Sequence, residues 1–221
     1  MIKIDNICAN GWMNAIRGMR NSHRSWDKMD SKFVETDGKL ELGPNDLELA
    51  QRLAVAGGPH AKFRRMIHVS MDILAPLYWW KEFDTYKIGT VANSDSTMYN
   101  ITKKEFEVGD FSFEKLAGDS HIKNVAEALM VVLNGLRDDY LDPANGDFIT
   151  KKNTWYQIIQ LLPSSYNQLR TVDLNYEVLN KIYVYRHDHK LDEWRKFCDL
   201  IADQLPYAKQ LILPAKLEES K

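Results

Sequence analysis

The sequence predicts an α+β fold in which a mixed or antiparallel sheet packs against helices. Apolar residues recur at helical spacing in several long segments, whereas one shorter segment alternates between apolar and polar residues as a strand does. The strands are not separated by regular helices, which argues against a doubly wound parallel sheet. No Ser-, Gly- or Pro-rich linker interrupts the chain, so we expect one domain over residues 1–214 and a frayed tail at 215–221.

Three elements are expected before the central strand. Asn14–Ser22 has few helix breakers and predicts a short helix. His23–Leu42 is polar and predicts a loop or hairpin. Asn45 is expected to cap a helix that begins at Asp46 and stops at Gly57-Gly58.

The segment Met66–Ile73 carries the strand pattern, because apolar residues alternate there with His68, Ser70 and Asp72. Ala75-Pro76 then opens a helix rich in aromatic residues, for which a core role is expected. Lys87–Tyr99 is small and polar and predicts a loop. Four further helices are expected, at 120–136, 153–162, 173–186 with Asp173 as cap, and 191–205.

Composition excludes several classes of function. The net charge of −2 gives no basic field of the kind that attracts nucleic acid polymers or anionic membranes. Cys8 and Cys198 are the only cysteines, and neither lies in a metal-ligand spacing. Neither a signal peptide nor a membrane-spanning run is evident, which predicts a cytoplasmic protein.

The familiar catalytic motifs are absent: the chain has no GxGxxG, P-loop, GxSxG or HExxH. No nucleophilic triad can be assembled, and no catalytic residue is assigned. His187-Asp188-His189 resembles a metal cluster, but neighbours on a helix point apart, so a solvated helix end is expected and no metal is predicted.

Candidate binding residues lie in three places. His60 follows a Gly-Gly helix stop and is either a ligand contact or a surface histidine. The loop 87–99 offers backbone amides and hydroxyls to a phosphate, or is a solvated turn. Asn175 and Arg186 are eleven residues apart and are expected on one helix face. Arg186 would bind a phosphate or carboxylate there, or form a salt bridge to a nearby Asp or Glu, or extend its charged end to solvent.

Read together, these segments resemble the flavin-dependent thymidylate synthases. Asn14–Ser22 resembles a short family helix through Arg20 and Ser22, and His60–Lys87 aligns with the family without a gap. The family's Arg-His-Arg signature corresponds to Thr85-Tyr86-Lys87. Further residues that match family positions are Asn93, Ser96, Tyr99, Leu162-Pro163, Asn175, Arg186 and Glu193.

The resemblance implies a fold like that of the thymidylate-synthase-complementing proteins and a homotetramer with flavin sites between subunits. It implies reductive methylation of dUMP to dTMP, in which methylenetetrahydrofolate supplies the carbon and NADPH the hydride, relayed through FAD. The expected flavin contacts are His60, Thr85, Tyr86, Lys87, Asn93 and Asn175. The expected nucleotide contacts are Ser94, Ser96, Arg170 and Arg186.

The chain also departs from the family pattern. The signature retains one charge, on Lys87, and the family's glutamate and late arginine become Ser94 and Met98. Lys62, Arg64, Arg65 or Arg170 would have to replace the lost contacts. Two alternatives therefore stay open: a non-catalytic nucleotide-binding homologue that acts as sensor or scaffold, and a flavoenzyme that acts on another pyrimidine nucleotide.

Overall fold

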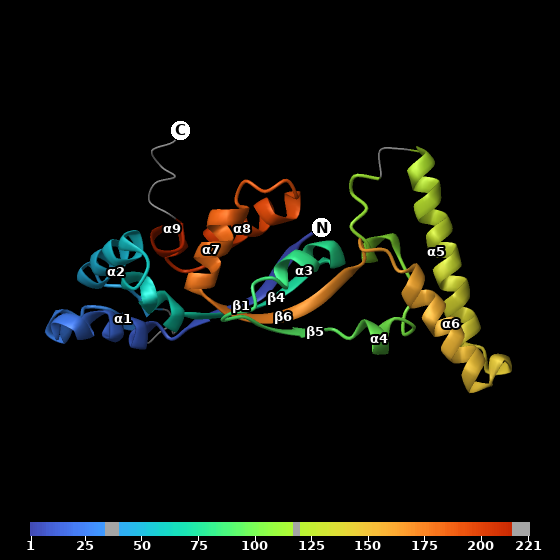
Figure 1. The fold of residues 1–221 in the computed structure, drawn as a ribbon, viewed down its shortest axis with the longest axis horizontal. Helices are drawn as coiled ribbons and strands as arrows, with labels where there is room; N and C mark the ends of the chain where they lie inside the picture. Colours follow the sequence, from blue (N-terminus) through green and yellow to red (C-terminus); the bar gives the residue numbers. More distant parts are fainter. Residues whose placement is uncertain (34–39, 117–119, 214–221) are drawn as a thin grey trace. The chain divides into compact units, whose positions relative to one another are not determined.

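A computed structural model describes residues 1–33, 40–116 and 120–213. Its main sheet is antiparallel, with four strands in the order β1-β4-β6-β5 (Figure 1). Their bounds are β1 Lys3–Asn10, β4 His68–Pro76, β6 Asn167–Asn175 and β5 Val91–Ser94. The strands β2 Lys32–Phe33 and β3 Leu40–Glu41 form a separate antiparallel pair. The predicted α+β class is therefore confirmed.

Helices make up most of the remaining chain. The α-helices are α1 Trp12–Arg20, α2 Pro44–Ala56, α3 Leu77–Phe83, α4 Thr97–Asn100, α5 Ser120–Leu141, α6 Phe148–Leu161, α7 Tyr176–Arg186, α8 Asp192–Gln204 and α9 Ala208–Leu211. The 3-10 helices are η1 Asn21–His23, η2 Trp26–Lys28, η3 His60–Met66, η4 Val108–Asp110 and η5 Pro143–Asn145.

The chain contacts divide the protein into two compact units. Unit 1 comprises residues 1–3, 73–85 and 93–170, and unit 2 comprises residues 4–72, 86–92 and 171–221. The division falls inside all four strands of the main sheet. The expectation of a single domain remains a prediction, and the expected frayed tail at 215–221 lies outside the described residues.

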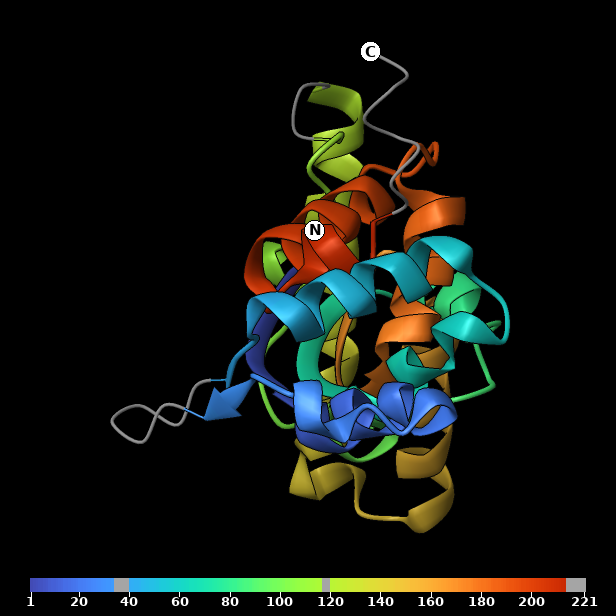
Figure 2. The same ribbon diagram turned by 90° about the vertical axis from the view of Figure 1, so that its left-hand side faces the viewer.

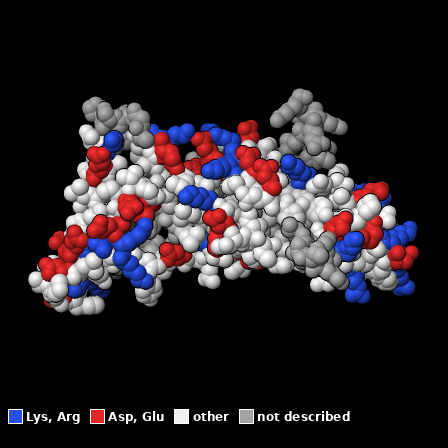
Figure 3. Space-filling model, turned by 180° about the vertical axis from the view of Figure 1, so that it is seen from behind, with Lys and Arg blue, Asp and Glu red and all other residues white. Residues whose placement is uncertain are grey.

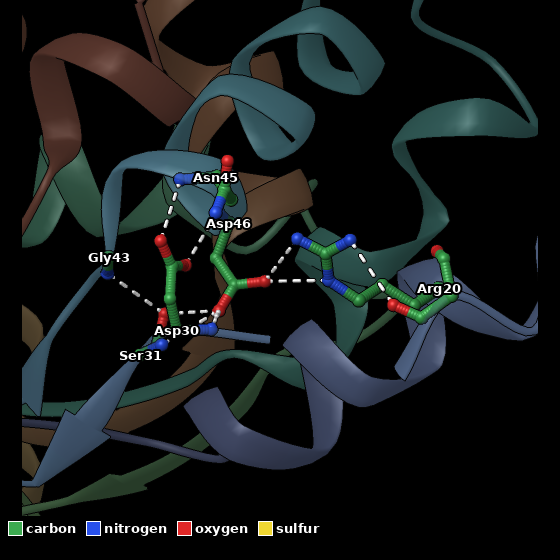
Figure 4. Close-up of polar contacts among 7 residues, drawn as sticks. Arg20, Asp30, Ser31, Gly43, Asn45 and Asp46 are labelled. Carbon is green, nitrogen blue, oxygen red and sulfur yellow. Dashed lines mark hydrogen bonds and ion pairs between the residues drawn. The ribbon is translucent and has the colours of Figure 1, made fainter. Parts of the chain in front are cut away.

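Unit 2 is built around η3, which packs against α1, α2 and α7. Figure 2 looks onto the end of this unit that carries α1, in blue, and α2, in cyan. Asp46 in the first turn of α2 is fully buried and accepts hydrogen bonds from Arg20 and Ser31 (Figure 4). The α2 N-terminus is capped by Asp30, which accepts from the backbone N–H groups of Asn45 and Asp46. The predicted cap, Asn45, is thus the donor rather than the acceptor.

Unit 1 contains a helical hairpin, α5 and α6, with its own core. The buried side chains of this core come from both helices and the preceding segment: Ile101, Phe106, Phe111, Met130, Leu133 and Ile158. Three aromatic residues of α3, Trp79, Trp80 and Phe83, are buried in the same unit, as expected, and the ring centres of Trp79 and Phe83 lie 5.0 Å apart in a stacked pair.

Three strand assignments differ from the sequence prediction. The strand β1 was not expected, although two buried isoleucines alternate at its start: Ile2 directly precedes it and Ile4 lies within it. The predicted loop 87–99 contains the strand β5 and the start of α4, because its polar residues occupy an exposed sheet edge. Residues 167–175 form β6, so Asp173 lies within a strand and does not cap a helix.

Candidate functional site

The segment 86–92 lies along α7 in unit 2. At one end, Arg186 Nε donates a 3.0 Å hydrogen bond to the Tyr86 hydroxyl. Farther along, Gly89 adopts a φ of +76°, and a Cβ added there would lie 2.9 Å from the Asn175 Nδ2. The segment therefore contacts both ends of α7 and brings the two predicted ligand residues Asn175 and Arg186 to a common stretch of chain.

Arg186 occupies an aromatic setting. Its guanidinium carbon lies 4.8 Å from the ring centre of Trp194 and 5.8 Å from that of Tyr86. The Nη1 atom also lies 2.8 Å from Nε2 of His189. Trp194 is fully buried, whereas Arg186 is only partly buried. A guanidinium beside two rings keeps its charge and gains cation–π attraction.

Asn175 ends β6 and caps α7, so the expectation that it shares a helix face with Arg186 is wrong. Its Oδ1 accepts a hydrogen bond from the Val178 N–H at 3.1 Å. The side chain is buried, with 7% exposure. Asparagine is favoured at this position because its oxygen satisfies an unpaired N–H of the first turn. The remaining amide group is the part that faces Gly89.

His60 and Lys87 are both exposed residues of unit 2. His60 begins η3, and this 3-10 helix packs against α7. Lys87 directly follows Tyr86. Both residues thus lie on segments that contact α7, and they remain candidate ligand contacts.

The other expected contacts belong to unit 1. Thr85 donates its hydroxyl to the Glu82 carbonyl at 2.7 Å, at the end of α3. Asn93 and Ser94 are exposed on β5, and Ser96 directly precedes α4.

Two of the four candidate replacement cations already have carboxylate partners. Arg170 lies 2.7 Å from Asp84 and 4.3 Å from the ring centre of Trp80. Arg64 is buried and lies 2.8 Å from Glu177. Burial lowers the pKa of Arg64 despite the neighbouring Glu177, yet an arginine remains charged at neutral pH. An anionic ligand would have to compete with these carboxylates, whereas Lys62 and Arg65 are exposed.

The contacts of Arg186 with His189 and Trp194 were not expected from the sequence. The sequence interpretation of His187-Asp188-His189, which lie in the connection 187–191 between α7 and α8, is a solvated helix end. A five-residue connection between antiparallel helices returns the first turn of the second helix to the last turn of the first. That spacing could have placed Trp194 beside Arg186.

Cys198 lies one turn beyond Trp194, and burial raises the pKa of its thiol to about 12. The thiol is therefore protonated at neutral pH and is not a nucleophile. Among the described residues, no group of His, Cys, Asp and Glu side chains could hold a metal ion.

The described surface bears charges of both signs. Figure 3 shows Lys and Arg interspersed with Asp and Glu on the face in view, rather than one field of a single sign. None of the helices in the described ranges has the length and apolar character needed to cross a bilayer.

Two solved structures have a similar fold, and both are thymidylate synthase X from Helicobacter pylori with FAD and dUMP. The first has a TM-score of 0.66 and 19% identity, and the match covers 96% of this chain and 97% of that chain. The second has a TM-score of 0.64 and 20% identity with the same coverage. No protein-family model matches the chain, and no curated protein matches it either. At this identity the likeness establishes the fold.

Proposed function

We propose that this protein binds FAD and dUMP and carries out the reductive methylation of dUMP to dTMP, with methylenetetrahydrofolate as carbon donor and NADPH as reductant. The observation that carries the proposal is the contact of the 86–92 segment with both Asn175 and Arg186. The fold is that of the two similar structures, whose ligands are FAD and dUMP.

The residues of unit 2 near α7 provide the hydrogen-bonding groups that a flavin nucleotide requires. Thr90 has a buried hydroxyl for which the described residues supply no hydrogen-bond partner. Gly89 allows the backbone to approach the Asn175 amide more closely than a residue with a Cβ could. Together with Lys87 and His60, these groups offer the donors that phosphates and a polar ring edge accept.

Each residue has a defined task in this proposal. Arg186 holds the nucleotide phosphate, Asn175 and His60 contact the flavin ring, and Lys87 neutralises phosphate charge. When bound, FAD supplies the hydride chemistry. The polypeptide then needs to orient and enclose its ligands rather than provide a nucleophile, which agrees with the protonated Cys198.

The first test is FAD retention. The purified protein is incubated with FAD, gel-filtered, and its absorbance spectrum recorded. We expect a bound flavin spectrum and NADPH oxidation that dUMP stimulates. A colourless protein after gel filtration would remove the flavin from the proposal.

A matched pair of variants tests Arg186. Arg186→Gln removes a charged donor, worth about 1.5–3 kcal/mol per hydrogen bond, so dUMP binding should weaken roughly 10- to 100-fold. Arg52→Gln changes an exposed arginine on α2 and should leave binding unchanged. Equal dUMP affinities for the two variants, measured by calorimetry, would rule out this role for Arg186.

A second candidate function is a nucleotide-binding homologue without turnover. It is favoured by the carboxylate partners of Arg64 and Arg170, which leave fewer cations for the nucleotide. Tritium release from carbon 5 of labelled dUMP separates the two, because binding alone releases none. The same oxidation assay with a panel of pyrimidine nucleotides tests the third alternative, a flavoenzyme with another substrate.

A further inference from the structure

We infer that Tyr86 is a positioning residue, which together with His189 fixes the orientation of the Arg186 guanidinium for the phosphate of a pyrimidine nucleotide. This inference rests on the proposed function and assigns a role to the residue that stands where the resembled family has a signature histidine.

Two side chains restrain the guanidinium in its own plane. The Tyr86 hydroxyl accepts from Nε at 3.0 Å, and His189 Nε2 lies 2.8 Å from Nη1. Bonds to two different nitrogens fix the rotation of the group, which a single bond would leave free. Two rings also contact the group, because the ring centres of Trp194 and Tyr86 lie 4.8 and 5.8 Å from the guanidinium carbon.

Donors face both ring nitrogens of His189. Arginine carries only donors, so Nε2 is the acceptor in the contact with Arg186 Nη1. The Leu191 N–H donates to Nδ1 at 3.2 Å. The contact with Arg186 is shorter and involves a charged donor, which makes it the stronger of the two.

Tyr86 itself is held by the protein core. Its ring meets the buried Trp194 edge to face, with 6.1 Å between centres. It begins the 86–92 segment that also contacts Asn175. The restraint on Arg186 thus comes from a residue that is anchored on both sides. An arginine ordered before the ligand arrives loses less conformational entropy on binding, and affinity rises accordingly.

The closing experiment compares Tyr86→Phe with Tyr185→Phe. The first substitution removes the hydroxyl and retains the ring, and the second removes a hydroxyl from an exposed tyrosine on the same helix as Arg186. We expect dUMP affinity, measured by calorimetry, to fall roughly 2- to 10-fold in Tyr86→Phe and to stay unchanged in Tyr185→Phe. In an Arg186→Gln background, Tyr86→Phe should have no further effect, because the role acts through the arginine.

A spectroscopic measurement on the ligand-free protein tests the restraint of Arg186 by Tyr86 separately from ligand binding. The Nε–Hε resonance of Arg186, assigned with Arg186→Gln, should be shifted by the neighbouring rings and protected from solvent exchange. Tyr86→Phe should abolish the protection, and Tyr185→Phe should preserve it.

The outcomes separate the two proposals. Protection that depends on Tyr86 in a protein that binds neither FAD nor dUMP supports the restraint of Arg186 by Tyr86, but overturns the proposed function and the nucleotide phosphate as the target of Arg186. Unchanged protection in Tyr86→Phe, or an equal loss of dUMP affinity with and without Arg186, overturns the positioning role even in an active enzyme.

Discussion

The carboxylate of Asp46 lies fully buried in unit 2 and is surrounded by donors from two other segments. Arg20 at the end of α1 contacts it at 2.7 Å, and the Ser31 hydroxyl and the backbone N–H of Asp30 bond its other oxygen. Burial opposes the charged carboxylate, but these hydrogen bonds together lower the pKa of Asp46. Arg20, which matched a family motif, therefore has a structural role here.

Asp46→Asn should destabilise the protein by about 3–5 kcal/mol, because it leaves the buried Arg20 without a counter-charge. The measurement is urea unfolding at pH 7, with Asp27→Asn on the exposed η2 as control. A lowered pKa contributes stability in full above the ordinary value of 3.8, and this contribution is lost as pH falls from there toward the lowered pKa. The wild type should therefore lose this part of its stability in acid, whereas Asp46→Asn should not. Equal acid sensitivity of both proteins would contradict this assignment.

At the scale of elements, the junction of β6 and α7 defines the candidate site. The strand ends and the helix begins at Asn175, so one side chain both caps the helix and faces Gly89. A cap role and a ligand role use different atoms of the same amide, and substitutions can separate them.

Asn175→Asp retains the capping oxygen, so its stability should remain within about 0.5 kcal/mol of the wild type. Asn175→Ala loses the cap and should cost about 1 kcal/mol. Both variants lack the amide donor, and both should retain less FAD after gel filtration. Thermal unfolding and flavin absorbance measure the two effects on the same samples. Full FAD retention by Asn175→Asp would show that the amide does not contact the flavin.

At the scale of the whole molecule, the exposed surface of α5 is a candidate subunit interface for the predicted homotetramer. Val125, Val131 and Val132 are 48–74% exposed, and Ala128 and Gly135 are exposed in the same stretch. The one charged residue between Val125 and Gly135 is Glu127, which lies 3.8 Å from Lys123. An apolar, nearly uncharged helix surface of this kind is typical of a contact with another protein chain.

Val125→Glu should lower the mass of the assembly, because it places a charge in that contact. Val55→Glu introduces the same change at an exposed valine of α2 and should leave the mass unchanged. Size-exclusion chromatography with light scattering measures both. A wild-type protein that elutes as a monomer would refute the homotetramer.

The positions of most helices could be predicted because their core-facing residues repeat at helical spacing. In α8, for example, Trp194, Phe197, Cys198 and Ile201 are all buried at that spacing. Both ends of β4 differ from the predicted strand Met66–Ile73, because the strand runs from His68 to Pro76. Ala75 and Pro76 belong to the strand, although a proline before an aromatic run favours the start of a helix. β6 was missed altogether. Its exposed face carries Leu169 together with the polar residues Thr171 and Asp173. The partners of these two polar residues, Asp72, His68 and Ser70, lie on another strand.

The sequence by itself determined the fold class, the helix positions and the absence of familiar catalytic motifs, because these follow from local periodicity and residue spacing. It also singled out Asn175 and Arg186, but on one helix face. Only the tertiary structure decided that Asn175 is a cap, that Arg64 and Arg170 have carboxylate partners, and that Tyr86, His189 and Trp194 surround Arg186. These contacts join residues that are up to 113 positions apart. The energy of an ion pair or ring contact depends on distance in space, which local sequence does not encode.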